Sequence, residues 1–336
     1  MGTQRIGVIH LNQIGDLVFS LPLLKALKDQ APGSEVHSIL RPHLRELLSA
    51  SPFVDRLISR KRGLKNQIDL LGELRRQKYD LLVTLSNSTE CLLLAGLSGA
   101  RLKAGFSNWP WDLGLDVKEK VEGHHGWYNN AKLLRRMKID IRKDDYVGLL
   151  VLPPRESPEP GGPHPEKVVV ISPGASLRRR VKAWEEKKFG ELIVRLKERY
   201  DLHPMIVGGP EDREVIDQVI GFVKEMDRGG TVTSIPNLAG KLSLKDLCYL
   251  LKGASLFVGV DSGIMHLASS LDIPVVGIFG PSDPFYVAPQ NARSAIVREE
   301  GMDCVPCYLK GCEARECMKR IKVEKVFEAC ERLLNR

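Results

Sequence analysis

The sequence lacks several features that would place it in a membrane or on nucleic acid. No run of about 18 apolar residues, the length that a membrane-spanning helix needs, occurs in its 336 residues. The first apolar run, Ile6–Leu11, is short and polar residues follow it at once, so the N-terminus does not resemble a secretion signal. The basic residues are dispersed and form no nucleic-acid recognition motif. We therefore expect a cytoplasmic protein that does not bind nucleic acid.

Cysteine is scarce, and the few cysteines that occur are unevenly placed. The chain has seven, of which four cluster near its C-terminal end: Cys304, Cys307, Cys312 and Cys317. A cytoplasmic setting disfavours disulfides. The CxxC pair and the two longer gaps that follow are compatible with a structural metal site, although they are tighter than the usual zinc patterns. Reduced, partly buried thiols are the alternative, and the sequence leaves both open.

Length and composition indicate an ordinary globular protein with two domains. A chain of 336 residues is long enough for about two domains of ~150 residues each. Hydrophobic residues make up 43% and charged residues 27%, as in typical globular proteins. A segment rich in proline and glycine interrupts the pattern near the middle of the chain. We predict an N-terminal domain at 1–154, a linker at 155–166, a C-terminal domain at 167–320 and a terminal helix at 321–336.

Positive charge is concentrated in the first half. Residues 1–150 hold 23 Lys and Arg against 16 Asp and Glu, whereas residues 151–336 hold 27 against 26. This asymmetry indicates an acidic partner for the first half, such as an anionic membrane surface or an acidic sugar lipid. An ordinary solvated basic surface is the alternative.

Short apolar runs alternate with helical patterns along the whole chain, which predicts an α/β fold with parallel sheets. The predicted strands are 5–11, 35–40, 56–59, 80–86, 102–106, 167–172, 204–207, 256–260 and 273–279. The predicted helices are 16–31, 64–77, 184–200, 243–252, 264–271 and 323–334. Ligands of such sheets bind beyond the carboxyl ends of the strands, so functional residues are expected there.

The junction within residues 255–284 is the most informative of these strand ends. An apolar strand stops at Asp261-Ser262-Gly263, a helix follows, and a second strand ends in the sequence GPSDP. Free N–H groups at the helix start suit a phosphate or diphosphate, and Gly263 allows a close approach. His266 lies three residues further along and is expected to face the same ligand. Alternatively, Ser262 only caps the helix and His266 only packs in the core.

Other strand ends carry further candidates. Asp16 follows the first strand, either as a helix cap or as a general base. Lys182 belongs to a basic segment after strand 167–172, where a lysine suits a diphosphate unless the segment is merely solvated. Glu211 and Asp212 follow strand 204–207, either as ligands of ribose hydroxyls or as acidic residues of a first helical turn.

Longer motifs resemble a known family. The segment VDSGIMHLASSLDIPVVGIFGPSDP is similar to the C-terminal signature of glycosyltransferase family 9, the bacterial heptosyltransferases of lipopolysaccharide core assembly. The N-terminal segment IGVIHLNQIGDLVFSLPLLKAL resembles that family's strand, Gly-Asp and proline-containing helix. SPGAS…KAW…F, VGGPED and NLAGKLSL resemble its central segments. The resemblance covers nearly the whole chain.

The resemblance implies a GT-B architecture, in which two Rossmann-like domains with parallel sheets face each other across a cleft. It implies inverting transfer with Asp16 as the candidate base. It places the donor around Ser176, Lys182, Asp261, Ser262, Gly263 and His266. It also implies that either Glu211 or Asp212 contacts the ribose, and the sequence does not decide between them.

The implied reaction moves heptose from ADP-heptose to an acidic glycolipid, the inner core of lipopolysaccharide, with a Kdo-lipid A or heptosyl-Kdo acceptor. No cofactor or metal is expected, in keeping with the lack of an Asp-x-Asp motif. The acceptor implies transient contact with the inner leaflet, as a peripheral protein on the cytoplasmic face of the inner membrane. The alternatives are a nucleotide-sugar epimerase or hydrolase, a family 9 transferase with another donor, and a non-catalytic nucleotide-binding protein.

Overall fold

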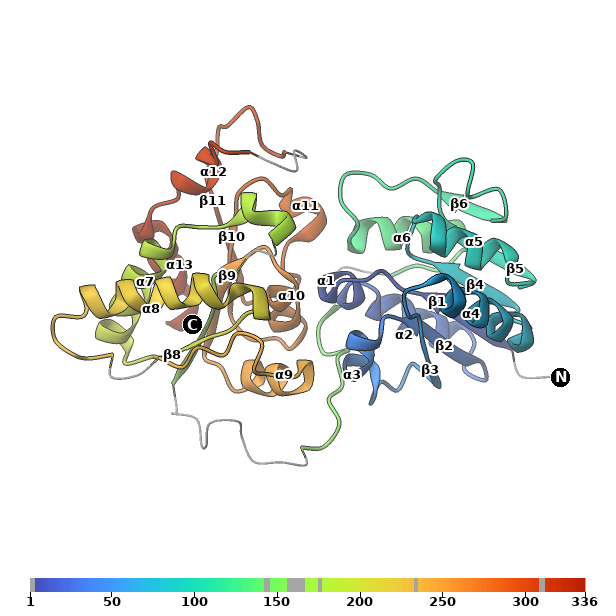
Figure 1. The fold of residues 1–336 in the computed structure, drawn as a ribbon, viewed down its shortest axis with the longest axis horizontal. Helices are drawn as coiled ribbons and strands as arrows, with labels where there is room; N and C mark the ends of the chain where they lie inside the picture. Colours follow the sequence, from blue (N-terminus) through green and yellow to red (C-terminus); the bar gives the residue numbers. More distant parts are fainter. Residues whose placement is uncertain are drawn as a thin grey trace. The chain divides into compact units, whose positions relative to one another are not determined.

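Two compact units make up the chain. The computed structural model describes residues 4–141, 146–155, 167–174, 177–232, 235–307 and 312–335. It divides the chain into an N-terminal unit, Met1–Pro153, and a C-terminal unit, Pro154–Arg336. The predicted linker lies outside the described residues, apart from Arg155. Each unit contains its own parallel sheet with helices packed around it (Figure 1).

The N-terminal unit has six strands in the order β3-β2-β1-β4-β5-β6, and all paired neighbours are parallel. Dinucleotide-binding Rossmann folds have the same order. The strands are β1 (Arg5–Ile9), β2 (Glu35–Leu40), β3 (Arg56–Ser59), β4 (Leu81–Thr84), β5 (Leu102–Phe106) and β6 (Val117–Glu119). The helices are α1 (Ile14–Val18), α2 (Leu21–Gln30), α3 (Arg45–Leu48), α4 (Leu64–Gln77), α5 (Thr89–Leu97) and α6 (Trp127–Arg136).

The C-terminal unit has five parallel strands in the order β11-β10-β9-β7-β8. They are β7 (Val168–Ser172), β8 (His203–Ile206), β9 (Leu256–Val260), β10 (Val275–Phe279) and β11 (Ser294–Arg298). The longer helices are α7 (Glu186–Tyr200), α8 (Arg213–Met226), α9 (Leu244–Lys252), α10 (Gly263–Ser270) and α13 (Val323–Leu334). The short ones are η3 (Leu177–Lys182), η4 (Pro210–Asp212), α11 (Pro284–Val287) and α12 (Glu316–Lys319).

Burial explains why the central strands read as unbroken apolar runs. Every residue of β4, β7, β9 and β10 is buried, as expected for parallel strands that are covered on both faces. Each unit contains a hydrophobic core, and in the C-terminal unit Trp184 and Phe189 pack edge to face within it. Among the helices that the structure describes, none has the length and apolar character to cross a bilayer.

The predicted α/β class is confirmed, but the first predicted helix is wrong in one respect. The sequence pattern runs through residues 16–31, whereas the structure has α1 and α2 with a break at Phe19 and Ser20. At this break Ser20 Oγ donates to the carbonyl of Leu17 at 2.6 Å and lies 3.0 Å from His10 Nδ1. Pro22 then lies in the first turn of α2, where its missing N–H is tolerated.

Candidate functional site

Four polar side chains meet at the carboxyl edge of the C-terminal sheet. Asp261 follows β9, Ser282 follows the neighbouring β10, Lys182 ends η3 after β7, and His266 lies on α10. Lys182 Nζ forms an ion pair with Asp261 Oδ2, to which Ser282 Oγ also donates at 2.5 Å. His266 Nε2 lies 3.7 Å from Asp261 Oδ1. Each of the four residues is less than a tenth exposed, so the sheet edge holds a buried polar cluster.

The geometry of this cluster keeps the carboxyl of Asp261 ionised. Burial would raise the pKa of the Asp261 carboxyl, but the ammonium of Lys182 and the imidazole of His266 outweigh it and hold the pKa far below its usual range. Asp261 is therefore an anion that holds a cation beside the start of α10. An ammonium has three N–H donors, so this ion pair leaves Lys182 able to bind phosphate oxygen as well.

The start of α10 has the form that the sequence predicted. Ser262 is its N-cap, and Ser262 Oγ accepts from the N–H of Met265 at 3.4 Å. Gly263 is the first helical residue. The cap and the ligand-binding interpretations are compatible, because one hydroxyl satisfies only one of the N–H groups at a helix start.

Glu211 and Asp212, which the sequence could not separate, occupy different environments. Asp212 is 9% exposed, and its Oδ2 accepts from the N–H of Gly209 at 2.8 Å. A Cβ added to Gly174 would lie 2.2 Å from the Asp212 Cγ, so the β7 loop packs directly on this carboxyl. Burial raises the pKa of Asp212. Glu211 is exposed beside a hollow of about 570 Å³ lined by Pro210, Glu211, Arg213, Glu214, Asp217 and Gln218.

The structure thus brings Lys182, Asp261 and His266 together, with Ser262 and Gly263 at the adjoining helix start. Ser176 lies outside the described residues. Ser282 is a member of the cluster that the sequence analysis did not single out. Its position at the end of the strand next to β9 is the signal that could have identified it.

In the N-terminal unit, Asp16 lies in the first turn of α1 and is half-buried. It is not the helix cap: that position is held by Gln13, without a side-chain hydrogen bond. Helix capping, the structural alternative predicted for Asp16, is therefore wrong. The residue still follows β1 at the carboxyl edge of the sheet, where parallel sheets bind their ligands.

A buried charged network fixes the loop that precedes Asp16. Both arginines of the network, Arg41 and Arg60, reach Asn12 Oδ1, and Arg60 Nη2 also donates to the His10 carbonyl at 3.0 Å. The two positive charges share the carboxylate of Glu90, because its Oε2 lies 3.1 Å from Arg41 Nη2 and its Oε1 lies 3.0 Å from Arg60 Nη1. Sequence spacing gave no sign of this network, since its members come from the ends of four different elements.

His10 is completely buried beneath this loop. Its Nδ1 lies 3.0 Å from Ser20 Oγ and its Nε2 lies 3.1 Å from Ser38 Oγ. Burial, and to a lesser extent the charge of Arg60, lowers the pKa of His10 to about 3. The imidazole is therefore neutral at physiological pH and acts as a structural link between β1, β2 and the break before α2.

The structure shows no preformed metal centre in the part of the chain that it describes. No group of three or more His, Cys, Asp or Glu side chains there could hold a metal ion. Cys304, Cys307, Cys312 and Cys317 are free thiols. Burial, together with the charges of the other three cysteines, raises the pKa of Cys317, which favours its thiol form.

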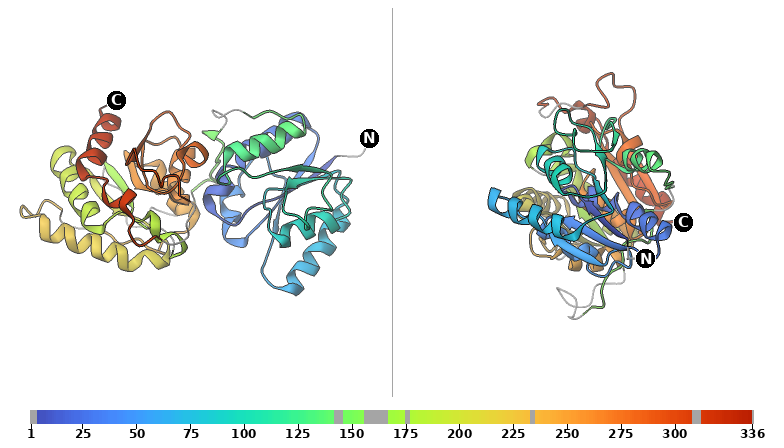
Figure 2. Two further views of the ribbon diagram at one scale, coloured as in Figure 1. Left: turned by 90° about the horizontal axis from the view of Figure 1, so that it is seen from above. Right: turned by 90° about the vertical axis from the view of Figure 1, so that its right-hand side faces the viewer.

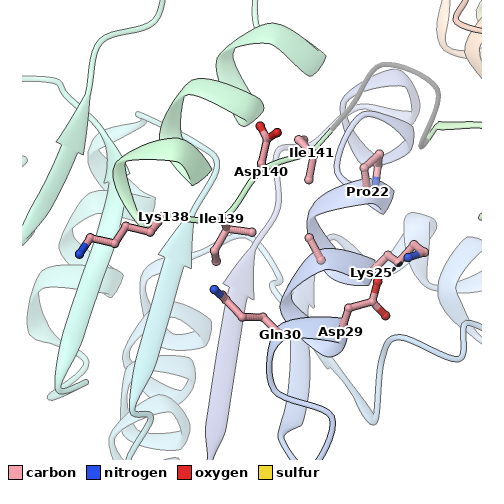
Figure 3. Close-up of a pocket in the computed structure, with 9 residues that line it drawn as sticks. Pro22, Lys25, Asp29, Gln30, Lys138, Ile139, Asp140 and Ile141 are labelled. Carbon is pink, nitrogen blue, oxygen red and sulfur yellow. Dashed lines mark hydrogen bonds and ion pairs between the residues drawn. The ribbon is translucent and has the colours of Figure 1, made fainter.

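A separate pocket of about 400 Å³ lies along α2 (Figure 3). Its lining is Pro22, Lys25, Ala26, Asp29, Gln30, Lys138, Ile139, Asp140 and Ile141. Lys25 and Asp29 pair with each other one helical turn apart, as exposed i,i+4 residues commonly do. We assign no chemistry to this pocket.

Comparison with known proteins identifies the family. The model of glycosyltransferase family 9 (heptosyltransferase) matches residues 68–318, about three quarters of the chain. The chain belongs to this family. It is therefore a glycosyltransferase. The predicted GT-B fold class is confirmed in that each of the two units contains a parallel sheet covered by helices. Asp16 lies outside the matched residues, so its role is not tested by this match.

Individual relatives agree with the family assignment. The chain is 26% identical to lipopolysaccharide heptosyltransferase 3 of Escherichia coli K12, over 95% of each chain. Among solved structures, a family 9 glycosyltransferase from Veillonella parvula has a TM-score of 0.82 at 20% identity and covers 100% of this chain and 99% of that one. The E. coli ADP-heptose lipopolysaccharide heptosyltransferase II has a TM-score of 0.76 at 21% identity, over 99% of both chains. At these identities the structures establish the fold alone.

Removing the shared carboxylate of the Asn12 network should strongly destabilise the protein. Glu90→Gln removes the counter-charge of Arg41 and Arg60, whose side chains are only 10% and 1% exposed. This loss should lower the free energy of unfolding by about 3 kcal/mol. The matched control is Glu73→Gln on α4, whose partner Arg56 is 46% exposed, and it should cost less than about 1 kcal/mol. Urea unfolding of both variants measures the difference, and equal costs would refute the buried network.

The buried His10 predicts a pH dependence of stability. Its pKa is about 3 in the folded protein and about 6.5 when unfolded, so between these values only the unfolded chain binds the proton. The contribution of the neutral His10 to the free energy of unfolding is therefore complete above pH 6.5 and is lost as the pH falls. Between pH 8 and pH 5 this loss amounts to about 2 kcal/mol. His10→Gln should remove this part of the slope in urea unfolding across that range. Parallel pH curves for the two proteins would contradict the assignment.

Proposed function

We propose that the protein transfers heptose from ADP-heptose to the inner core of lipopolysaccharide. The two E. coli relatives named above support this proposal, since both are lipopolysaccharide heptosyltransferases. The single structural observation that carries it is the Lys182–Asp261 cluster beside the start of α10. A cation, helix N–H groups and hydrogen-bonding side chains in one buried edge match a diphosphate linked to a sugar.

In this proposal the C-terminal unit holds the donor. Lys182 and the N–H groups at Gly263 bind the diphosphate, and Ser176 in the same loop region contributes to it. Asp261, Ser262 and His266 orient the sugar and the phosphate joined to it. Glu211, exposed beside its hollow, contacts the ribose, whereas Asp212 is buried and holds the turn in place. The resulting positive environment stabilises the departing ADP without a cofactor or a metal ion.

The N-terminal unit supplies the base and receives the acceptor. Asp16 takes the proton of the acceptor hydroxyl while the hydroxyl oxygen attacks the anomeric carbon of the donor sugar. The attack comes from the face opposite ADP, so the configuration of the anomeric carbon is inverted. The excess of positive charge in residues 1–150 attracts the acidic Kdo-lipid A or heptosyl-Kdo acceptor. We infer that the protein works as a peripheral enzyme at the cytoplasmic face of the inner membrane, in transient contact with its inner leaflet.

Two substitutions separate these roles. Asp16→Asn should lower kcat by about 100-fold to 10,000-fold and leave ADP affinity unchanged, because the amide cannot accept the proton. Lys182→Met should weaken ADP binding by about tenfold or more, because a charged hydrogen bond to phosphate is lost. Turnover is followed by ADP release, and ADP affinity by calorimetry.

Asp29→Asn is the matched control for Asp16→Asn, since Asp29 is an acid on the next helix that pairs with Lys25 at the surface. It should keep its kcat within about twofold of the unmodified protein, as surface substitutions usually do. Full turnover by a folded Asp16→Asn variant would exclude Asp16 as the base. Unchanged ADP affinity in Lys182→Met would exclude the Lys182–Asp261 cluster as the diphosphate site.

A further inference from the structure

Large exposed apolar side chains gather on one part of the N-terminal unit. Among the described residues, eleven large hydrophobic side chains are well exposed, and seven of them belong to α4, α5 and the segment that follows β5. We call these seven the apolar rim: Leu64 and Ile68 on α4, Leu93 and Leu97 on α5, and Trp109, Trp111 and Leu113 after β5. Their clustering, more than the exposure of any one residue, points to a function.

Three contacts join the parts of the apolar rim. The helices α4 and α5 lie side by side (Figures 1 and 2), and Arg75 Nε on α4 donates to the Leu97 carbonyl at 2.8 Å. The backbones of Gly96 and Gly114 touch, because a Cβ added to Gly114 would lie 2.6 Å from Gly96 Cα. Leu113 therefore lies next to the end of α5. Asn108 Nδ2 donates to the Asn87 carbonyl at 2.9 Å and ties the tryptophan segment to the approach of α5.

The tryptophans are held outward by the fold of their own segment. The Asp112 side chain points inward, accepts from the N–H of Asn108 at 3.1 Å and lies 3.7 Å from Lys118 Nζ. Its neighbours in the sequence, Trp111 and Leu113, are left 45% and 71% exposed, and Trp109 is 79% exposed. Leaving these side chains in water forgoes the favourable free energy that their burial would give. A partner that covers the apolar rim would recover part of that energy.

The charges beside the apolar rim identify the kind of partner. Lys61, Arg62 and Lys65 are all exposed around Leu64, and no acidic residue occurs between Asp55 and Asp69. Tryptophan with leucine and isoleucine, bordered by lysine and arginine, is the composition that binds an anionic bilayer surface. A second copy of the chain would bring the same positive charges together, and lysine is depleted in protein interfaces. The charge pattern therefore favours lipid over protein.

We propose that the apolar rim docks the N-terminal unit on an anionic membrane, an inference that rests on the proposed transfer to a lipid-borne acceptor. The tryptophan and leucine side chains enter the headgroup region, while Lys61, Arg62 and Lys65 pair with lipid phosphates. The helices α4 and α5 start at the carboxyl edge of the sheet, where Arg60 and Glu90 join the Asn12 network before Asp16. Docking through the apolar rim would thus present that edge to an acceptor anchored in the same bilayer.

Sedimentation with lipid vesicles tests this proposal without donor or acceptor. The purified protein should bind vesicles of phosphatidylethanolamine and phosphatidylglycerol at least about tenfold more tightly than vesicles of phosphatidylcholine, and added salt should weaken the binding. The combined variant Trp109→Ser, Trp111→Ser, Leu113→Ser should bind the anionic vesicles about tenfold less tightly. All three side chains are exposed, so the variant should keep the melting temperature of the unmodified protein.

The matched control removes exposed apolar side chains from the C-terminal unit instead. Phe285→Ser with Ile296→Ser, at positions 54% and 39% exposed, should leave vesicle binding unchanged. Equal binding by the tryptophan variant and the unmodified protein would overturn the proposal. So would failure of the unmodified protein to bind anionic vesicles, or a loss of self-association in the variant alone, which would assign the apolar rim to a second copy.

This test is separable from that of the proposed function. Transfer to a soluble, deacylated acceptor does not need a membrane, so the tryptophan variant should retain it at the level of the unmodified protein. A chain that binds vesicles through the apolar rim but transfers no sugar would support the docking surface and refute the function. A chain that transfers sugar but does not bind vesicles would support the function and refute the docking surface.

Discussion

The buried ion pair between Lys182 and Asp261 is the interaction on which the proposed chemistry depends. Charged groups that are less than a tenth exposed are costly unless they are paired, and here the pair is completed by Ser282 and His266. The cluster holds an ammonium in place before any ligand arrives. A diphosphate that binds there meets a positioned charge, so little reorganisation is needed when ADP departs.

In both units polar and charged groups lie together at the ends of the strands, but they form different networks there. In parallel sheets the strand ends are the places where polar groups gather without disturbing the apolar layers, and each unit has a buried charged network there. In the C-terminal unit the network lies at the start of α10, where a donor would bind. In the N-terminal unit Arg41, Arg60 and Glu90 hold Asn12, and so they fix the loop that precedes Asp16. In the proposed mechanism one edge binds an anion, and the other supports a base.

The sequence predicted those parts of the molecule that depend on local pattern. Apolar runs located the central strands because these strands are buried on both faces, and α4 and α13 followed from helical periodicity. The polar turn after β9 pointed to Asp261 because a carboxylate directly after a buried strand has few structural reasons to be there. Parts that depend on tertiary contacts were not predicted. Ser282 joins the cluster only because β10 lies beside β9, and Glu211 and Asp212 differ only in what packs on them. Likewise, Ser20 at the break after α1 contacts His10, which no local pattern indicates. The short strands β6 and β11 were missed because partial burial gave them no continuous apolar run.

The most direct test of the account is the mass of the acceptor after reaction. A deacylated Kdo-lipid A acceptor is incubated with the protein and ADP-heptose, and in parallel with other nucleotide-sugars. The account predicts that the acceptor gains the mass of one heptose, that ADP is released only when the acceptor is present, and that the other donors are used poorly. Consumption of ADP-heptose without the acceptor would instead indicate a hydrolase or epimerase. Efficient transfer of a different sugar would contradict the assignment of heptose.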